Sequence, residues 1–399
     1  MAYTALVIGG GIAGTASAIA LHKAGIEAVV HEAYDRPADD VGAFLTLAVN
    51  ALDALRALGF DVTRLGFETP RITLTSGSGR RIGDLPHGPR LPDGTVSRTV
   101  KRAELYRALR EQALARGIRI EYGKRLTDAV STGGGVRARF ADGSTAEAGL
   151  LIGADGVRSR TRRIIDPDAP GARYGGMVNV GGCARGVRAG EPGTMHAVFG
   201  RRAFFAYAAQ PDGQVLWAAN LMRPVEPTPA ALAAISGPRW RADLTDAFRR
   251  DHSPALALIE ATETLVTGWT TYDVPSVPRW HRDHLVIVGD AAHATVPSAG
   301  QGAALALEDA VVLAKCLRDT PGIGPAFAAY ERQRRDRVER VVAHGRRTDT
   351  WKTLGPVARL TRDLVMRLAL KHLARTGHDP SRWIYDHHLD WDEPAPAAR

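Results

Sequence analysis

Three glycines near the start of the chain have a spacing that suits the binding of phosphate groups. Gly9, Gly11 and Gly14 follow the pattern G-x-G-x-x-G, directly after an apolar run that predicts a buried strand over 3–8. In such a turn the first glycine permits the tight bend, and the second lets a pyrophosphate approach the backbone. The third lets the following helix, predicted over 12–24, pack on the sheet and point the positive end of its dipole at the phosphates.

An acidic residue stands where a dinucleotide would place its ribose. Glu32 follows the second predicted strand, over 26–31, and lies about 20 residues beyond the glycines. A carboxylate there accepts hydrogen bonds from the two hydroxyls of an adenosine ribose. The order of strand, helix, strand and acid therefore predicts a dinucleotide site rather than an ordinary glycine-rich turn. These residues do not distinguish NAD from FAD.

Two later motifs also follow predicted buried strands. Asp155 and Gly156 form a sharp turn after the predicted strand over 150–152. Asp290 lies at the end of another predicted buried strand, where a carboxylate can hold a sugar hydroxyl. The loop over 300–302, Gly-Gln-Gly, opens the next helix and presents backbone amides together with a helix N-terminus. That arrangement would stabilise negative charge on a reduced, anionic ring.

The elements around these motifs predict an α/β chain. A Rossmann-like dinucleotide-binding domain is interrupted by an inserted β-sheet domain, and the pattern is mainly helical after residue 302. We assign the dinucleotide domain to 1–70, 98–172 and 278–325. We assign the β-sheet substrate domain to 71–97 and 173–277, and a helical C-terminal region to 326–399.

Composition narrows the class of protein. The chain has 399 residues and a net charge of +9, and its densest arginine run, over 331–347, has the i,i+4 pairing of a solvated helix face rather than a nucleic-acid patch. No second long uncharged run suggests a membrane span, and the first lacks the basic residues that precede a signal peptide core. Cys183 and Cys316 have no metal or redox spacing, which favours a reducing cytoplasm. We expect neither a nucleic-acid nor a membrane partner, and no bound metal.

Taken together, the three ordered motifs resemble those of the class A flavoprotein monooxygenases, the para-hydroxybenzoate hydroxylase-like family. The motifs are the glycine turn with Glu32, the Asp155-Gly156 pair and the Gly289-Asp290 pair, and they span about three quarters of the chain. The tail over 380–391 is similar to that of the single-component subgroup with the salicylate and urate hydroxylases. The resemblance implies a glutathione reductase-type FAD domain, FAD as cofactor, and NADPH or NADH as transient electron donor.

The resemblance also implies roles for individual residues. Glu32 would hold the adenosine ribose, Asp290 the ribityl chain and Arg102 the pyrophosphate, while Asp155 is associated with both FAD and NAD(P)H use. Many relatives carry Asn soon after the Gly-Gln-Gly loop, where this chain has Ala303 and Ala304, so one polar contact near the ring is missing. The full set of expected cofactor residues is Gly9, Gly11, Ile12, Ala13, Gly14, Glu32, Ala33, Thr46, Arg102, Leu126, Asp155, Asp290, Pro297, Gly300, Gln301, Gly302 and Ala303.

Strands of the inserted sheet are expected to form the substrate pocket. Period-2 spacing places Phe205 and Tyr207 on one face of their strand, and Leu216 and Ala218 on one face of the next. Our alignment places Gln214 where the urate hydroxylases carry a substrate-binding arginine, which disfavours urate. The expected pocket residues are Phe205, Tyr207, Gln214, Leu216 and Pro297.

The sequence does not identify a catalytic residue. A phenolic substrate calls for a base with a pKa near neutrality, for which the candidates are His293 and His196, with Tyr207 as a relay. His293 equally suits a structural role. The expected reaction is hydroxylation or epoxidation of a planar aromatic or polyketide-like molecule by NAD(P)H and O₂ through a flavin C4a-hydroperoxide, in a monomer or homodimer. The alternatives are a non-oxygenating flavin oxidoreductase and a small-molecule binding protein with residual FAD affinity.

Overall fold

The structure of the chain is a computed structural model that describes residues 4–37 and 42–395. Within these two ranges, no helix is long and apolar enough to cross a membrane.

One sheet of the described chain is mainly parallel. Its strands, in spatial order, are β18 (His281–Arg282), β19 (Leu285–Ile287), β12 (Leu150–Gly153), β1 (Thr4–Ile8), β2 (Glu27–His31) and β8 (Arg119–Glu121). β18 runs antiparallel to β19, and the other neighbours are parallel. These strands are short apolar runs because both faces of a parallel sheet are covered by other elements.

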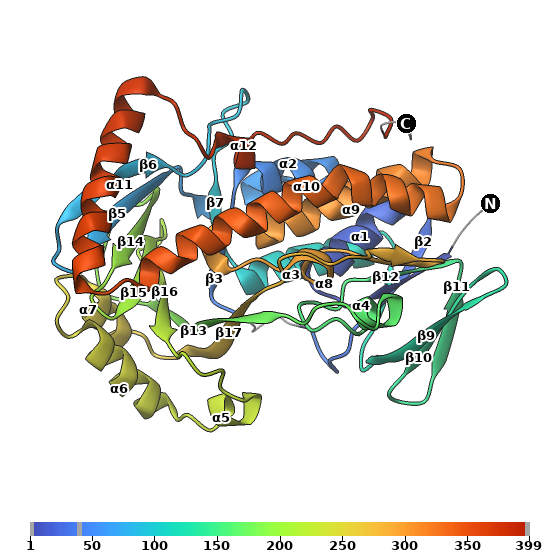
Figure 1. Ribbon diagram of the computed structural model, residues 1–399, viewed down its shortest axis with the longest axis horizontal. Coiled ribbons are helices and arrows are strands. Elements are labelled where there is room, and N and C mark those ends of the chain that lie inside the picture. The colour runs from blue at the N-terminus through green and yellow to red at the C-terminus, as the bar shows by residue number, and fades with distance from the viewer. Residues whose placement is uncertain (1–3, 38–41, 396–399) are drawn as a thin grey trace.

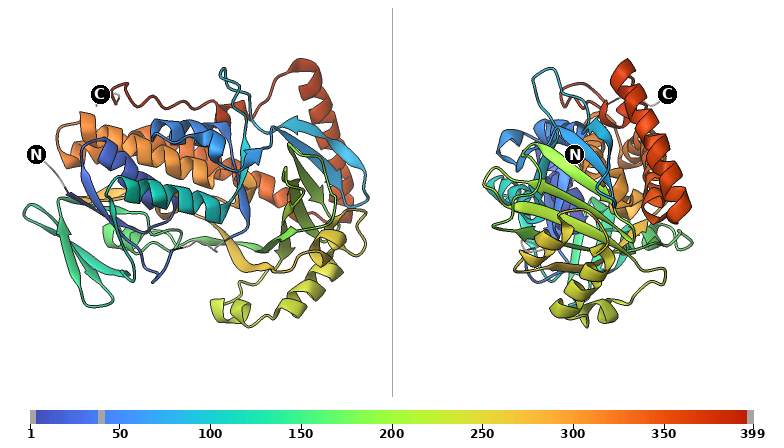
Figure 2. Two further views of the ribbon diagram at one scale, coloured as in Figure 1. Left: turned by 180° about the vertical axis from the view of Figure 1, so that it is seen from behind. Right: turned by 90° about the vertical axis from the view of Figure 1, so that its left-hand side faces the viewer.

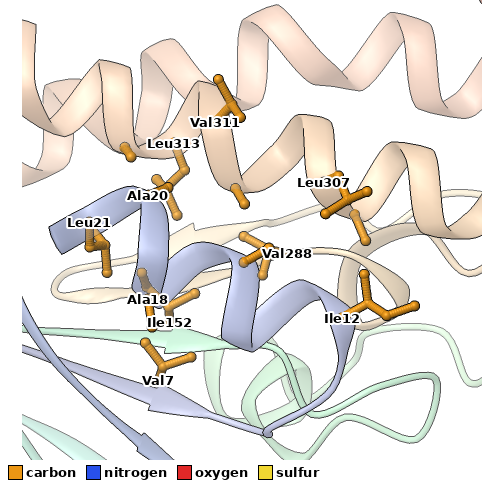
Figure 3. Close-up of a cluster of buried hydrophobic side chains, with 14 of the residues drawn as sticks. Val7, Ile12, Ala18, Ala20, Leu21, Ile152, Val288, Leu307, Val311 and Leu313 are labelled. Carbon is orange, nitrogen blue, oxygen red and sulfur yellow. The ribbon is translucent and has the colours of Figure 1, made fainter. Parts of the chain in front are cut away.

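The core of this region forms where helix α1 (Ile12–Lys23) packs between the sheet and helix α9 (Gly302–Asp319). Figure 3 shows Val7 and Ile152 of the sheet on one side of α1, and Leu307 and Val311 of α9 on the other. Small side chains such as Ala18 let α1 pack close to both layers, because they occupy little volume at the contact.

Two small antiparallel sheets and several helices complete this part of the chain. One sheet consists of β11 (Thr145–Ala148), β10 (Gly135–Phe140) and β9 (Leu126–Thr132), and the other of β3 (Phe44–Leu47), β7 (Arg98–Lys101) and β4 (Phe67–Glu68). The helices are α2 (Val49–Ala57), η1 (Val62–Arg64), α3 (Arg102–Ala115), α4 (Arg160–Ile165), α8 (Asp290–His293) and η2 (Pro297–Ala299).

A second large sheet is mainly antiparallel. Its described strands, in spatial order, are β17 (Val266–Asp273), β13 (Arg173–Ala184), β16 (Val215–Met222), β15 (Ala203–Ala209), β14 (Thr194–Phe199), β5 (Arg71–Ser76) and β6 (Arg81–Pro86). Helices α6 (Gly237–Phe248) and α7 (Ala255–Glu260), which follow α5 (Pro229–Ala233), cover one face, which we call the outer face. The inner face packs against β3, β4 and α11 (Pro356–Thr376).

The C-terminal helices connect the two large sheets. Figure 1 shows α10 (Ile323–Asp349) running along the molecule from the parallel sheet to the antiparallel sheet, and Figure 2 shows the same course from behind. The turn η3 (Thr350–Thr353) then leads into α11, and α12 (Arg382–Tyr385) begins the return of the chain. Arg318 on α9 donates to the carbonyl of Trp391 at 2.7 Å, so the tail lies against the parallel-sheet region.

The predicted fold class is confirmed, because a parallel Rossmann-like sheet, an antiparallel sheet and C-terminal helices are all present. The prediction for 331–347 needs one correction. The stretch is helical and Arg335 pairs with Glu331 at 2.5 Å, but Arg334 is fully buried rather than solvated. Helical i,i+4 pairing describes only the outer side of α10, because its inner side packs on α9.

Candidate active site

The three glycines of the β1–α1 turn have different physical surroundings. Gly9 has a φ of +108°, and a Cβ on Gly14 would lie 1.8 Å from the carbonyl oxygen of Gly9. Both positions are therefore closed to larger residues by the fold itself. A Cβ on Gly11 would meet no described atom within 4 Å. The backbone at Gly11 faces open space that a ligand can occupy.

Glu32 ties the end of β2 to this turn. One carboxylate oxygen accepts from the backbone amide of Gly10 at 2.6 Å, and the other accepts from the amide of Tyr34 at 2.9 Å. The two bonds fix the carboxylate beside the glycine turn and leave further lone pairs on each oxygen for a ligand hydroxyl.

A cavity of about 900 Å³ opens at this turn. It extends from the parallel sheet to β17, where Trp269 and Tyr272 line it. The expected cofactor residues that line it are Gly9, Gly11, Glu32, Ala33, Leu126 and Asp155.

The carboxylate of Asp155 is hydrogen-bonded to residues at the start of α4. Its carboxylate accepts from the hydroxyl of Ser159 at 2.5 Å and from the backbone amides of Arg160 and Thr161 at 2.8 and 2.9 Å. These are capping bonds that satisfy free amides of the helix. Gly156 lines the same cavity, and a Cβ there would meet no described atom within 4 Å.

A second group of expected residues surrounds the start of α3. The amide of Arg102 donates to the carbonyl of Ala43 at 3.1 Å, and Nη2 donates to the hydroxyl of Tyr106 at 2.9 Å. Gly42 has a φ of +84°, and a Cβ there would lie 2.7 Å from Cδ of Arg102. Nε of Arg102 is buried and has no hydrogen-bond partner among the described residues. A buried donor without a partner is costly, so this atom is suited to an anionic ligand.

Asp290 begins α8 and approaches the glycine turn from the opposite side. Gly289 has a φ of +59°, and a Cβ there would lie 2.8 Å from Cβ of Ala13, which brings this junction against α1. Surrounding protein desolvates the Asp290 carboxyl and raises its pKa, although water still reaches it. His293 and Arg102 oppose the rise, and Asp309 adds to it.

The loop before α9 is held in place by α2. Gln301 is buried, and its Oε1 accepts from Nδ2 of Asn50 at 2.8 Å. Gly300 has a φ of +61°, and Gly302 begins the 18-residue helix α9. The helix therefore directs its positive end at the space beside Pro297 and Gly300.

Comparison with known proteins identifies the family. A family model described as an FAD binding domain matches residues 2–344. The chain belongs to the class A flavoprotein monooxygenases. This monooxygenase is 33% identical over 352 residues to the FAD-dependent urate hydroxylase of Klebsiella pneumoniae, which covers 86% of the chain and 88% of the relative.

Other relatives of the monooxygenase agree with this placement. The 6-hydroxynicotinate 3-monooxygenase of Bordetella bronchiseptica is 30% identical over 375 residues, covering 86% of the chain and 91% of the relative. The structure of Klebsiella pneumoniae HpxO with FAD and uric acid superposes with a TM-score of 0.81 at 29% identity, covering 94% of this chain and 95% of that one. FAD is the cofactor and NAD(P)H the electron donor, and the substrates of the family are aromatic or heterocyclic.

Two features of the monooxygenase fit FAD on physical grounds. Open space lies above Gly11 at the positive end of α1, and Nε of Arg102 is buried without a described partner. A pyrophosphate would fill the first and accept from the second. In the described part of the chain, no group of three or more His, Cys, Asp or Glu side chains is placed to hold a metal ion.

The structure separates the residues that were expected to share a substrate pocket. Phe205 and Tyr207 lie on the outer face, where Phe205 stacks on Trp217 with centroids 5.3 Å apart and packs against α6. Leu216 lies on the inner face with Phe44 and Phe67. The expectation of one shared pocket wall is therefore wrong, because the register between β15 and β16 places Phe205 beside Trp217 rather than Leu216.

Gln214 and Pro297 remain near the inner face and its loop. Nε2 of Gln214 donates to Asp212 at 2.9 Å, and the thiol of Cys183 donates to its Oε1 at 3.0 Å, so Gln214 is held at the end of the β15–β16 hairpin. Pro297 begins η2, directly before the Gly300 loop. Thr46 lies on β3, where its hydroxyl is 3.1 Å from that of Thr99.

The histidine candidates for a base are both committed elsewhere. Nε2 of His293 lies 2.5 Å from Oδ2 of Asp309, and both side chains are buried. The ring of His196 stacks on Tyr207 at 4.6 Å on the outer face, and burial lowers its pKa. Burial also raises the pKa of Tyr207. His196 and Tyr207 therefore lie on the outer face of the sheet, and His293 is the last residue of α8.

Sequence reasoning missed several residues that the structure brings to the site. Asn50 holds Gln301, and Asn179, Asn220 and Lys352 form a polar cluster on the inner face. The two asparagines carry a signal that was available, because each is an amide within an otherwise apolar strand. Lys352 and Asn50 carry no periodic or motif signal.

Proposed function

We propose that the chain hydroxylates, or epoxidises, a planar aromatic or heteroaromatic small molecule held between the 297–302 loop and the inner face of the antiparallel sheet. One observation carries this proposal. A Cβ on Gly181 of β13 would lie 2.7 Å from Cβ of Ala43, so the inner face closes directly on the segment that also holds Arg102. A flat substrate beside this contact would be shielded from water by the sheet.

Within this proposal, the chain's residues hold FAD along the cleft described above. Glu32 would accept from the adenosine ribose, the amides at Gly11 and the guanidinium of Arg102 would bind the pyrophosphate, and Asp290 would accept from the ribityl chain. Asp155 acts indirectly by fixing the turn at Gly156. The N-terminus of α9 and the amides at 300–303 would stabilise negative charge on the flavin ring.

The bound cofactor supplies the redox chemistry, in which one oxygen atom of O₂ enters the substrate and the other becomes water. The balance is substrate–H, O₂, NAD(P)H and H⁺ giving substrate–OH, H₂O and NAD(P)⁺. The protein orients the ring and excludes water. Leu216, Phe44 and Phe67 provide an apolar wall for this purpose.

The relatives support an aromatic or heterocyclic substrate, since their names specify urate and 6-hydroxynicotinate. Urate itself is disfavoured for this chain. The substrate-binding arginine of the urate hydroxylases, which our alignment places at position 214, is absent, and Gln214 is bound to Asp212 and Cys183.

The test is anaerobic stopped-flow reduction of the FAD-loaded protein by NADPH and by NADH, with a panel of phenols, hydroxypyridines and polycyclic aromatics. We expect one ligand class to accelerate flavin reduction, and labelled O₂ then to enter the product. Reduction without incorporation of oxygen would instead indicate a non-oxygenating oxidoreductase. A flavin that neither nicotinamide reduces with any ligand would contradict the proposal.

A further inference from the structure

Three polar side chains form a buried cluster on the inner face of the antiparallel sheet. Nδ2 of Asn220 on β16 donates to Oδ1 of Asn179 on β13, and Nζ of Lys352 on η3 donates to Oδ1 of Asn220 at 2.7 Å. The side chain of Lys352 is 9% exposed, and Asn179 and Asn220 are 2% and 8% exposed. The three residues come from separate parts of the chain and meet only in the folded protein.

The cluster lies between the sheet and the loop expected beside the flavin. Phe204 pairs with Asn220 across β15 and β16, and Nζ of Lys352 lies 4.3 Å from the centre of the Phe204 ring. On the other side, Asp349 is 3.5 Å from Nζ of Lys352 and accepts from the hydroxyl of Ser298. Ser298 follows Pro297 in η2, so the cluster connects the inner face to that loop.

The packing of the sheet alone does not require a cation at this point. Burial of an ammonium group is costly unless its donors and charge are matched. Asp349, at 3.5 Å, is the one ion-pair partner of Lys352 in the described part of the chain, and that carboxylate is also bound to Ser298. Burial lowers the pKa of Lys352, and Asp349 opposes the change. The remaining neighbours that we identify carry no charge: the ring face of Phe204 attracts the ammonium, and Oδ1 of Asn220 accepts a hydrogen bond from it.

We propose that Lys352, aligned by its hydrogen bond to Asn220, binds the anionic oxygen of an acidic aromatic substrate on the inner face of the sheet. This inference rests on the proposed function and narrows its substrate class to phenols or carboxylic acids that bind in the deprotonated form.

The chemical consequence depends on which oxygen Lys352 binds. A phenol would bind as its phenolate and release its proton to water, because an ammonium within hydrogen-bond distance stabilises the anion. The negative charge would increase electron density on the ring carbons that accept oxygen, so no separate protein base would be needed for this step. A carboxylate would be oriented by the same ammonium without changing the ring.

The test uses FAD-loaded protein and three probes that share one nitrophenyl ring: 4-nitrophenol, 4-nitrobenzoate and the neutral 4-nitroanisole. Binding is measured by the change in flavin absorbance, and the ionisation of bound 4-nitrophenol by its phenolate band. The variants are Lys352→Met, the cation-retaining Lys352→Arg, and the control Lys371→Met, which removes the same charge from an exposed position on α11. Melting temperature and FAD content are recorded for each.

For wild-type protein we expect acidic probes to bind more tightly than 4-nitroanisole. Lys352→Met should weaken the acidic probe by about tenfold or more, the effect of losing a hydrogen bond to a charged group, and leave the neutral probe within about twofold. Lys352→Arg should retain most of the affinity, and Lys371→Met should match wild type. A lowered pKa of bound 4-nitrophenol identifies the phenolate as the bound oxygen, whereas selective binding of 4-nitrobenzoate identifies the carboxylate.

Two results would overturn the inference. One is equal weakening of acidic and neutral probes in Lys352→Met, which would indicate a structural role. The other is failure of both acidic probes to bind wild-type protein at millimolar concentration. If Lys352→Met does not fold, Asp349→Asn decides: removing that negative charge should tighten acidic probes several-fold, and unchanged or weaker binding would contradict the inference.

The inference and the proposed function fail in different ways. Oxygen incorporation into a neutral ligand that is unaffected by Lys352→Met would preserve the function and reject the inference. Conversely, anion binding that depends on Lys352, without any ligand that promotes flavin reduction, would preserve the inference and reject the function.

Discussion

Nε of Arg334 donates to Oδ1 of Asp309 at 2.8 Å, and neither side chain is exposed to solvent. The same guanidinium lies 2.7 Å from Glu308. Asp309 in turn accepts from the amide of Gly289 at 2.8 Å, and its Oδ2 lies 2.5 Å from Nε2 of His293. One buried cation on α10 therefore fixes the start of α8, where Asp290 lies.

Arg334→Met should destabilise the protein in a pH-dependent way. Burial acts to raise the pKa of both carboxyls, but Arg334 and then Arg337 hold that of Glu308 at about 2, and His293 and then Arg334 hold that of Asp309 at about 2. Because these pKa values lie below the ordinary ones, their contribution to stability is present above about pH 4.5 and is lost as the pH falls through about 2. Removing the cation leaves buried carboxylates, so we expect a loss of about 3–5 kcal/mol in the free energy of unfolding at pH 7.

The variant should also change the slope of stability against pH near neutrality. Wild type should lose stability as the pH falls from 7 to 5, because burial lowers the pKa of His87 and of His387 to about 4, so the unfolded chain binds more protons. With the carboxyl pKa values raised above those of the unfolded chain, Arg334→Met should gain stability relative to wild type over the same range. Urea unfolding at three pH values measures this, with Arg332→Met, an exposed position on the same helix, as the control. Parallel slopes in variant and wild type would show that Arg334 does not set these pKa values.

Two alanine substitutions in the β1–α1 turn should separate folding from cofactor binding. Gly14→Ala places a Cβ 1.8 Å from a backbone oxygen and should destabilise the fold by about 3 kcal/mol. Gly11→Ala adds a methyl group to open space at a φ of −75°, so the free energy of unfolding of the apoprotein should change by less than about 1 kcal/mol. FAD titration of apoprotein should nevertheless show weaker binding by Gly11→Ala. Normal FAD affinity would place the pyrophosphate elsewhere.

Arg102→Ala should weaken FAD binding without unfolding the protein. The buried Nε has no described partner, so in the holoenzyme it is free to donate to a phosphate oxygen. Loss of such a bond, worth about 1.5–3 kcal/mol, should raise the dissociation constant of FAD by about ten- to hundredfold. Fluorescence titration measures the change, and Arg107→Ala, exposed on the same helix, controls for net charge. Equal affinities in the two variants would exclude Arg102 from the pyrophosphate site.

Tyr207→Phe should leave catalysis intact. Its ring stacks on His196 on the outer face, away from β3 and the 297–302 loop. We expect kcat/KM for substrate-stimulated NAD(P)H oxidation to stay within about twofold of wild type, because no transition-state contact is removed. A tenfold loss of kcat/KM would make Tyr207 a catalytic candidate again.

The amino-acid sequence by itself determined the first half of the cofactor site. Gly9, Gly11, Gly14 and Glu32 lie within one βαβ unit, where the strand, turn and helix lengths fix the relative positions of the residues. Local backbone geometry is encoded in a short stretch, so residue type and spacing are sufficient to predict it.

Only the tertiary structure decided which face of the sheet each strand residue occupies and which distant residues meet. Alternation along β15 and β16 separates the two faces of each strand, but the pairing of Phe205 with Ala219 and the packing of α6 decide that Phe205 joins Trp217 on the outer face. Likewise Lys352 and Asn220 are 132 positions apart and are joined by the path of α10 between the two sheets. Such contacts depend on the free energy of packing whole elements together, which no local pattern of residues records.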